Sequence, residues 1–317
     1  MSVYTELSHA DITAILGAYE LGALQSFEGI AAGIENSNFF VDTDQGRYVL
    51  TIFERMQAGE LPYFMHLMHH LSAAGFVCPD VMRRSDGEYL FDVAGKKGAI
   101  VSRLSGRTLD ALSSVQLQQA GRALASLHLA GASFDKRREN PTGFAWLKDT
   151  AGRMEADVAR VYGSEAAGLL HDEINWQAGR DESVLPRGVI HGDLFCDNIL
   201  FDGDEVSGVI DFYYAHDASY AMDVAISLNA LAMQVGMSGI AQGDDAGRMQ
   251  CFLDGYQALR PMGEVEHEHL PGLLRRAALR FWSSRLFDAL YPRGGAMTQT
   301  KDPEEYRLKL LFHRAGS

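Results

Sequence analysis

The chain has 317 residues, of which 47% are hydrophobic and 22% charged, so we expect a packed core in one large or two modest domains. Its formal net charge of −14 argues against a nucleic-acid-binding protein, because phosphate backbones select surfaces rich in lysine and arginine. The charge also gives no support for docking on anionic lipid. It leaves neutral, zwitterionic and cationic small-molecule substrates open.

The cysteines and the N-terminal segment predict a cytoplasmic protein. Cys78, Cys196 and Cys251 are far apart and form no CxxC pair, which favours a reducing compartment and argues against a disulfide framework or a zinc site. The first residues show no basic region followed by an apolar run, so no signal peptide is expected. No stretch approaches the roughly 18 apolar residues of a membrane span.

The first hundred residues predict a small sheet with one inserted helix. A helical pattern leads up to about Tyr19, with Ser8 as its N-cap. A second helix is expected between Pro62 and Gly75, where apolar residues recur at helical spacing. Turn signals separate the strand-like runs. These runs are residues 26–32, 38–42, 47–53, 89–93 and 99–104.

Beyond Leu104 the pattern is mainly helical. Helical periodicity is present in residues 115–130, 165–179, 222–234, 248–259 and 270–290. A β-rich island interrupts them at residues 189–191, 198–201 and 206–211, with Asp202-Gly203-Asp204 as a hairpin turn. We therefore predict an α+β fold with a small β-rich lobe at 1–103 and a larger helical lobe at 104–317.

The stretch VIHGDLFCDNILF, residues 189–201, followed by VIDF at 209–212, is the most specific motif. Phosphoryl transfer needs a carboxylate to orient the attacking hydroxyl and oxygen ligands for magnesium, and Mg²⁺ takes one or two protein oxygens beside phosphate oxygens. Asp193 at a strand end, Asn198 five residues on and Asp211 after a short hairpin supply two acids and an amide. These residue types predict a metal–phosphate site.

The pattern H-G-D-x-x-x-x-N followed by I-D-F resembles the aminoglycoside-phosphotransferase and choline-kinase group, which are relatives of the protein kinases. The resemblance implies a two-lobed protein-kinase-like fold and the use of ATP and Mg²⁺. By the same resemblance Asp193 is the catalytic base, Asn198 and Asp211 ligate magnesium, and His191 braces the loop. Asp223 matches the aspartate at a helix start that supports this loop, although local sequence alone makes it a helix cap.

A nucleotide site is expected from the same resemblance. Residues 29–38 resemble the loop that covers the nucleotide between the first two strands. Gly33 would permit a close backbone approach to phosphate, and Asn36 and Ser37 would offer donors. Residues 100–104 would form the inter-lobe hinge, where the backbone of Val101 and Ser102 can meet adenine.

The lysine–glutamate pair expected from the family resemblance is missing from the sequence. Typical relatives carry a lysine on the third strand, paired with a glutamate on the next helix, whereas this strand has Thr51 and residues 61–76 contain no Asp or Glu. Because both the lysine and the glutamate are absent, neither leaves an unpaired charge behind. We expect an active kinase that neutralises phosphate with Lys96, Arg47 or Arg55. The rival interpretation is a nucleotide-binding pseudokinase.

Within the group, the chain resembles the bacterial homoserine kinases. The stretches that carry this resemblance are GIENSNFF at 33–40, LPYF at 61–64, LLRRAALRFWSSRL at 273–286, PRG at 292–294 and KDP at 301–303. The resemblance implies ATP-dependent phosphorylation of the hydroxyl of L-homoserine to O-phospho-L-homoserine, a step towards threonine. Kinases of the same group that act on choline, ethanolamine, an aminoglycoside or a sugar are the alternatives.

An amino-acid substrate needs a guanidinium for its carboxylate and an acid for its ammonium. Arg276 and Arg280 are four residues apart on the late helix and share a face. His216 and Asp217 follow the metal aspartate, where acceptor-side groups lie in relatives. The predicted substrate residues are Tyr213, Tyr214, Arg280, Trp282 and Arg285. Pairing with other residues or packing is the competing interpretation of the late arginines and Trp282.

Overall fold

The computed structural model describes residues 5–30, 36–234, 244–292 and 301–316. The chain divides into two compact units. Unit 1 comprises Met1–Gly106 and Ser207–Tyr213, and unit 2 comprises Arg107–Val206 and Tyr214–Ser317. Residues 207–213 therefore belong with the N-terminal residues, which a single division near residue 103 does not anticipate. Within unit 1 the N–H of Val209 donates to the carbonyl of Val77 (3.0 Å).

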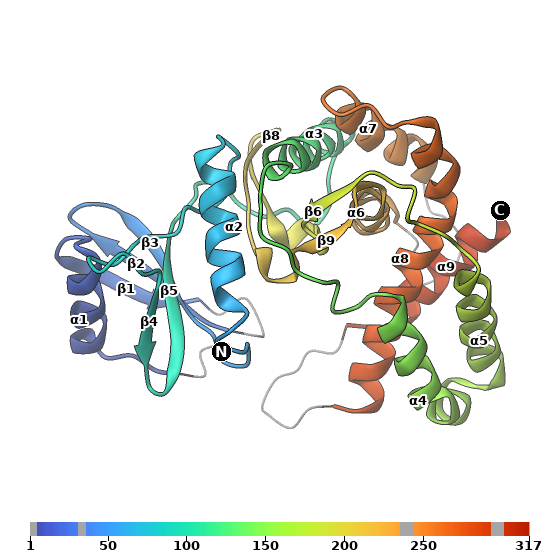
Figure 1. The fold of residues 1–317 in the computed structure, drawn as a ribbon, viewed down its shortest axis with the longest axis horizontal. Helices are drawn as coiled ribbons and strands as arrows, with labels where there is room; N and C mark the ends of the chain where they lie inside the picture. The colour runs from blue at the N-terminus through green and yellow to red at the C-terminus, as the bar shows by residue number, and fades with distance from the viewer. Residues whose placement is uncertain (1–4, 31–35, 235–243, 293–300, 317) are drawn as a thin grey trace. The chain divides into compact units, whose positions relative to one another are not determined.

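Unit 1 is the five-stranded antiparallel sheet with an inserted helix that the sequence predicts (Figure 1). Its strand order is β1-β2-β3-β5-β4. The strands are β1 (Leu24–Gly29), β2 (Ser37–Thr43), β3 (Arg47–Ile52), β4 (Leu90–Val93) and β5 (Lys96–Ser102). Helix α1 (His9–Tyr19) precedes the sheet and helix α2 (Leu61–Ala73) joins β3 to β4.

The core of unit 1 forms where α1 packs on the sheet. Strand β2 alternates strictly between buried and half-buried side chains, as a strand with one covered face must. Ile12 and Leu16 of α1 meet Val41, Leu50 and Ile52 of the sheet in one apolar cluster. Burying each of these side chains stabilises the unit by about 1.5–3 kcal/mol. A capping box between Ser8 and Asp11 starts the helix.

Unit 2 is mainly helical, with two short two-stranded sheets. Strand β6 (Arg187–Ile190) pairs with β9 (His216–Ser219), and β7 (Ile199–Asp202) pairs with β8 (Glu205–Val209), whose last three residues are assigned to unit 1. The helices are α3 (Ser114–Gly131), α4 (Phe144–Tyr162), α5 (Ser164–Ala178), α6 (Tyr220–Ser227), α7 (Asp245–Gln257), α8 (Glu264–Leu290) and α9 (Glu304–Ala315). In the described part of the chain no helix is both long and apolar enough to cross a membrane.

Helices α3 and α7 pack with their backbones in close approach. A Cβ atom on Gly121 would lie 2.1 Å from the carbonyl oxygen of Phe252, and one on Gly255 would lie 1.9 Å from that of Gln118. Only glycine fits at these two positions. This close packing fixes α7 against the helix that carries His128, a residue of the site described below.

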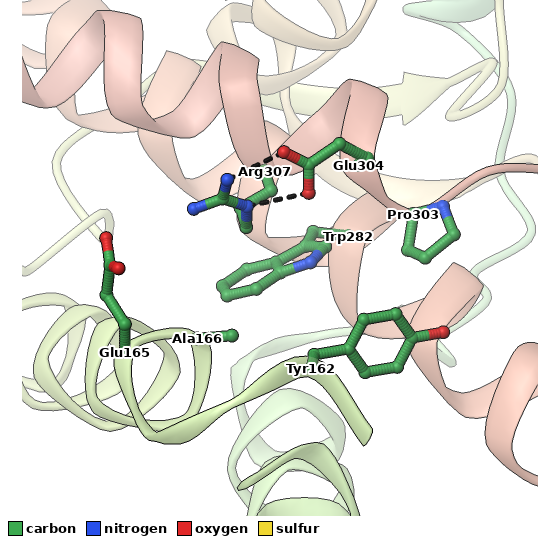
Figure 2. Close-up of a pocket in the computed structure, with 7 residues that line it drawn as sticks. All are labelled: Tyr162, Glu165, Ala166, Trp282, Pro303, Glu304 and Arg307. Atoms are coloured by element: carbon green, nitrogen blue, oxygen red, sulfur yellow. Dashed lines mark hydrogen bonds and ion pairs between the residues drawn. The ribbon is translucent and has the colours of Figure 1, made fainter. Parts of the chain in front are cut away.

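Helix α8 lies at the centre of the helical layer, and most of its side chains from Leu273 to Leu286 are buried. Helices α4, α5, α6 and α9 all contact it. Trp282 of α8 is 1% exposed. It borders a small cavity of about 140 Å³ between α4, α5 and α9, beside the ion pair of Arg307 and Glu304 (Figure 2).

Candidate active site

The catalytic loop predicted from the sequence follows β6 in unit 2. His191 is fully buried. Gly192 has a φ of +75°, and a Cβ atom there would lie 3.0 Å from both His216 and the carbonyl oxygen of Tyr214. Glycine is therefore required on both conformational and steric grounds. The tight turn brings Asp193 toward solvent, where its side chain keeps 21% of its exposure.

Asp223 of α6 holds this turn in place. Its side chain is fully buried, and its two carboxylate oxygens accept the backbone N–H groups of His191 (2.8 Å) and Gly192 (2.9 Å). Burial alone would raise the pKa of Asp223, but the hydrogen bonds from His128 and Gly192 lower it. The carboxylate therefore stays ionised inside the protein and fixes the backbone that carries Asp193.

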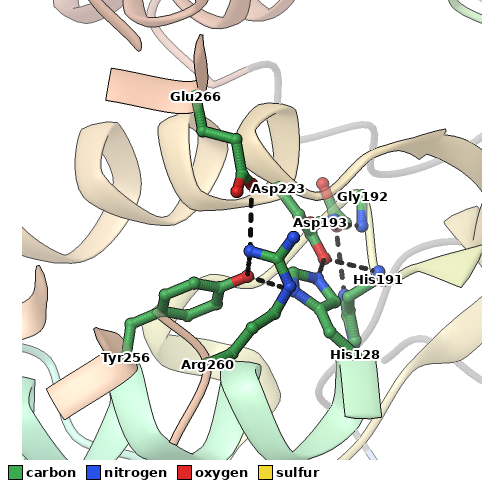
Figure 3. Close-up of polar contacts among 8 residues, drawn as sticks. All are labelled: His128, His191, Gly192, Asp193, Asp223, Tyr256, Arg260 and Glu266. Atoms are coloured by element: carbon green, nitrogen blue, oxygen red, sulfur yellow. Dashed lines mark hydrogen bonds and ion pairs between the residues drawn. The ribbon is translucent and has the colours of Figure 1, made fainter. Parts of the chain in front are cut away.

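His128 of α3 continues the network away from the loop (Figure 3). Its Nε2 lies 3.0 Å from Asp223, and its Nδ1 lies 2.7 Å from the hydroxyl of Tyr256. Arg260 donates to that hydroxyl (3.1 Å) and to Glu266 (2.9 Å). Burial lowers the pKa of His128, so a neutral ring donates through Nε2 to Asp223 and accepts the Tyr256 proton at Nδ1.

Asn198 follows in a short 3₁₀ turn, Cys196–Asn198. Its Nδ2 donates to the carbonyl of Asp193 (2.8 Å), and its side chain is almost fully buried. The hydrogen bond fixes the amide plane, so that Oδ1 is the atom that can ligate a cation. The structure thus brings Asp193 and Asn198 together as the sequence predicts.

Asp211, the third predicted residue, belongs to unit 1. It has a φ of +64°, a left-handed conformation that residues other than glycine adopt rarely and often at functional sites. Two residues further on, the ring of Tyr213 packs edge-on against Phe53 and Phe64, at 5.2 and 5.7 Å between ring centroids. Its hydroxyl is hydrogen-bonded to Thr51.

Unit 1 also carries the predicted nucleotide residues. Gly33 lies outside the described residues, and Asn36 lies just before β2. The Ser37 hydroxyl is buried and donates to Glu54 (2.5 Å). The N–H of Ser102 donates to the carbonyl of Asp80 (2.8 Å) at the end of β5. Contact of adenine with the backbone of Val101 and Ser102 stays a prediction.

A lysine–glutamate pair is present in unit 1 at an unexpected place. Lys96 forms an ion pair with Glu54 and donates to the hydroxyl of Thr5 (2.8 Å). Antiparallel pairing of Ile52 with Gly98 extends past β3 and carries residue 54 to residue 96. Burial would raise the pKa of Glu54, but the hydrogen bonds from Lys96 and Ser37 lower it.

Arg47 and Arg55, the other two cations predicted to neutralise phosphate, are more exposed than Lys96. Arg47 keeps 72% of its side-chain exposure and lies 3.7 Å from Asp42, and Arg55 is exposed. Thr51, at the position of the expected strand lysine, donates to Asn38 (2.8 Å). A neutral hydrogen-bonded pair therefore fills this position. Lys96, by contrast, is a cation bound to the buried carboxylate of Glu54.

The predicted substrate residues Arg280, Trp282 and Arg285 lie in three different surroundings. Arg280 of α8 lies near the catalytic loop, with Nη1 3.9 Å from Asp193 and its guanidinium 5.6 Å from the ring of Tyr214. Trp282 borders the separate cavity of Figure 2. Arg285 donates to Glu305 (2.7 Å) and to the carbonyl of Asp302, so it ties α8 to α9.

Burial and charge act in opposite directions on Asp193. Burial raises the pKa of its carboxyl, while the positive charges of Arg280 and Lys301 lower it, and the net shift is upward. A carboxylate with a raised pKa is a stronger base than a solvated one, which suits proton acceptance from an alcohol.

A model of the phosphotransferase enzyme family matches residues 26–262. The chain belongs to this family. Two curated homoserine kinases, from Methylobacillus flagellatus and Methylobacterium radiotolerans, are each 43% identical to this phosphotransferase over 99% of its length and over 95% and 96% of theirs. The homoserine kinase of Agrobacterium fabrum is 40% identical, with 99% and 96% covered.

Solved structures show the same fold. An amicoumacin kinase bound to AMP-PNP and Ca²⁺ superposes with a TM-score of 0.69 at 15% identity, covering 97% of this phosphotransferase and 95% of that chain. A Plasmodium vivax ethanolamine kinase superposes with a TM-score of 0.63 at 13% identity, covering 99% and 92%. The two-lobed, protein-kinase-like α+β fold predicted from the sequence is confirmed.

Proposed function

We propose that this phosphotransferase transfers the γ-phosphoryl group of ATP to the side-chain hydroxyl of L-homoserine. The similarity that carries this proposal is the 40–43% identity to curated homoserine kinases over nearly the whole length of both chains. The HGD loop, whose backbone N–H groups are held by the buried carboxylate of Asp223, supports the phosphoryl-transfer part of the proposal independently. The products are O-phospho-L-homoserine and ADP.

Asp193 acts as the base in the proposed reaction. The homoserine oxygen forms a bond to the γ-phosphorus, the bond from that phosphorus to the bridging oxygen of ADP breaks, and the hydroxyl proton passes to Asp193. Asp223 positions the loop through the N–H groups of His191 and Gly192. The His191 side chain is buried beneath the loop and braces it.

Asn198 and Asp211 would hold Mg²⁺. The fixed amide of Asn198 and the exposed carboxylate of Asp211 are hard oxygen donors of the kind that Mg²⁺ prefers, so the residues fit the ion. When bound, the ion neutralises charge on the phosphates. Lys96 would add a second positive charge on the nucleotide side, with Glu54 holding its ammonium group in place. Asn36, just before β2, would contribute to the covering loop, whereas the buried hydroxyl of Ser37 donates to Glu54 instead.

An acceptor panel tests the proposal. ADP release is measured with ATP and Mg²⁺ in the presence of L-homoserine, choline, ethanolamine, an aminoglycoside or a hexose, and the phosphorylated product is identified by ³¹P NMR. We expect turnover with L-homoserine and a much lower kcat/KM with the others. Turnover of choline or an aminoglycoside without turnover of L-homoserine would overturn the proposal. Nucleotide binding without turnover of any acceptor would identify a pseudokinase.

A further inference from the structure

A cavity of about 240 Å³ opens in unit 2 beside Arg280. It differs from the cavity of Trp282 and is lined by both acidic and basic side chains. Its wall is formed by residues from 140–147, 182–187 and 217–222 and by two arginines of α8, Arg276 and Arg280. Its polar lining includes Thr142, Asp217, Ser219 and Arg280.

Arg280 contributes a buried guanidinium to this wall. Its side chain keeps 8% of its exposure, its Nε donates to the hydroxyl of Thr142 (3.2 Å), and its plane stacks over Phe281 at 3.8 Å. Its ion-pair partner within the described chain is Asp193, at 3.9 Å, which is beyond hydrogen-bond distance. Because Nε is held by Thr142, the two Nη groups are positioned to receive an anion.

Thr142 is itself oriented. Its hydroxyl donates to the side-chain oxygen of Asn140 (3.2 Å), whose oxygen also accepts the N–H of Thr142 (2.9 Å). The hydroxyl oxygen therefore has its lone pairs directed at Arg280. The guanidinium is fixed both by this hydrogen bond and by stacking, so an anion that binds it meets a preorganised group.

Asp217 supplies the opposite charge. Its side chain keeps 15% of its exposure and accepts the N–H of Arg138 (2.9 Å) and one bond from Arg137, whose side chain is 69% exposed. A carboxylate has about four acceptor positions, so further bonds can be made. Strand β9 pairs with β6, with Asp217 opposite Val189, so this carboxylate lies on the strand next to the one that leads to Asp193.

Ser219 is the third polar group. Its side chain is buried, with 5% exposure for the residue, and its hydroxyl has no hydrogen-bond partner among the described residues. A buried hydroxyl without a partner costs stability unless a ligand or water satisfies it. Its position in the wall of the cavity makes it available to a polar ligand.

We propose that this cavity binds the head group of an α-amino acid acceptor, with Arg280 on its carboxylate and Asp217 on its ammonium. Ser219 donates a further hydrogen bond to the bound head group. The inference rests on the proposed function and deepens it, because it explains selection of L-homoserine over acceptors that lack a carboxylate. The short side chain of homoserine then carries its hydroxyl towards Asp193, which lies next to Arg280.

The test measures KM for L-homoserine and inhibition by L-2-aminobutyrate, which has the same head group and no hydroxyl. We expect Arg280→Gln to raise both KM and Ki about 10- to 100-fold, the range for a lost charge-assisted hydrogen bond. Arg280→Lys should recover part of the loss. Asp217→Asn should raise both constants roughly 10-fold, and Ser219→Ala by less.

Two matched variants act as controls. The Ser283 hydroxyl is also buried without a partner among the described residues but does not line the cavity, so Ser283→Ala should leave KM and Ki unchanged. If Arg280→Gln does not fold, Thr142→Val removes only the hydroxyl that holds Nε, with Thr150→Val on α4 as its control. Thr142→Val should raise KM several-fold.

The outcomes separate the two proposals. If the unmodified protein does not phosphorylate L-homoserine, the proposed function fails. If it does, and Arg280→Gln lowers kcat while KM and the Ki of L-2-aminobutyrate stay unchanged, then Arg280 acts only through its charge on Asp193. That result would overturn the assignment of the cavity.

Discussion

The two units hold their functional charges in different ways. In unit 2, Asp223 is fully buried, and its carboxylate accepts two backbone N–H groups as well as the His128 ring. In unit 1, Lys96 keeps 34% of its side-chain exposure while its partner Glu54 keeps 7%. The first arrangement fixes the backbone of the catalytic loop, and the second holds a cation at the start of strand β5.

This difference suits Asp223 to positioning the loop and Lys96 to the phosphate contact proposed for it. Two of the bonds of Asp223 end on main-chain N–H groups of the catalytic loop, so they determine the shape of that loop whether or not a substrate is bound. A lysine ammonium has three donors, and Lys96 uses two of them on Thr5 and Glu54. The remaining donor and the partial exposure leave Lys96 able to meet a phosphate.

Replacement of the base should have the largest effect. Asp193→Ala removes the proposed proton acceptor and should lower kcat by at least ~10²-fold. The thermal unfolding temperature should change little, because the Asp193 side chain is partly exposed and Asp223 still holds the loop. The measurement is initial-rate kinetics together with a melting curve. Asp197→Asn, four residues away with 66% side-chain exposure, is the control and should leave kcat near that of the unmodified protein.

Replacement of Lys96 should change mainly the KM for ATP. Lys96→Met should raise that KM about 10- to 100-fold, the cost of one charge-assisted hydrogen bond, with a smaller change in kcat. The neighbouring Lys97 lies on the same strand but pairs with the exposed Asp92, so Lys97→Met is a matched control. Equal KM values for both variants would show that Lys96 serves only to neutralise Glu54.

The elements predicted most accurately from the sequence are those with local signals. Alternation and turn residues predicted the five strands of unit 1, and the capping box at Ser8 predicted the start of α1. The catalytic loop was predictable for the same reason, since Asp193 and Asn198 are five residues apart in one motif. The contact between them confirms that proximity.

Contacts between distant residues could not be predicted in this way. Lys96 and Glu54 meet because β3 and β5 pair in one particular register, and 42 positions separate them in the chain. His128 and Tyr256 are 128 positions apart. Helices α4 and α9 were missed altogether, although the buried residues of α4 from Leu147 to Val158 recur at helical spacing.

The smallest expected effect tests whether the buried network of unit 2 positions the loop. Tyr256→Phe removes the hydroxyl that donates to His128 and accepts from Arg260, and it should lower the free energy of unfolding by about 1 kcal/mol. Tyr19→Phe in unit 1 removes a comparable buried hydrogen bond, from the Tyr19 hydroxyl to the carbonyl of Tyr89 at 2.6 Å. It should therefore destabilise the protein by a similar amount.

Activity distinguishes these two tyrosine variants. With His128 less firmly held, Asp223 orients the turn at Gly192 less well, so Tyr256→Phe should lower kcat several-fold while leaving KM for ATP unchanged. Tyr19→Phe should leave kcat unaltered. Urea unfolding and initial rates at one temperature give both quantities. Equal kcat values for the two variants would mean that the network beyond Asp223 stabilises the fold without positioning the catalytic loop.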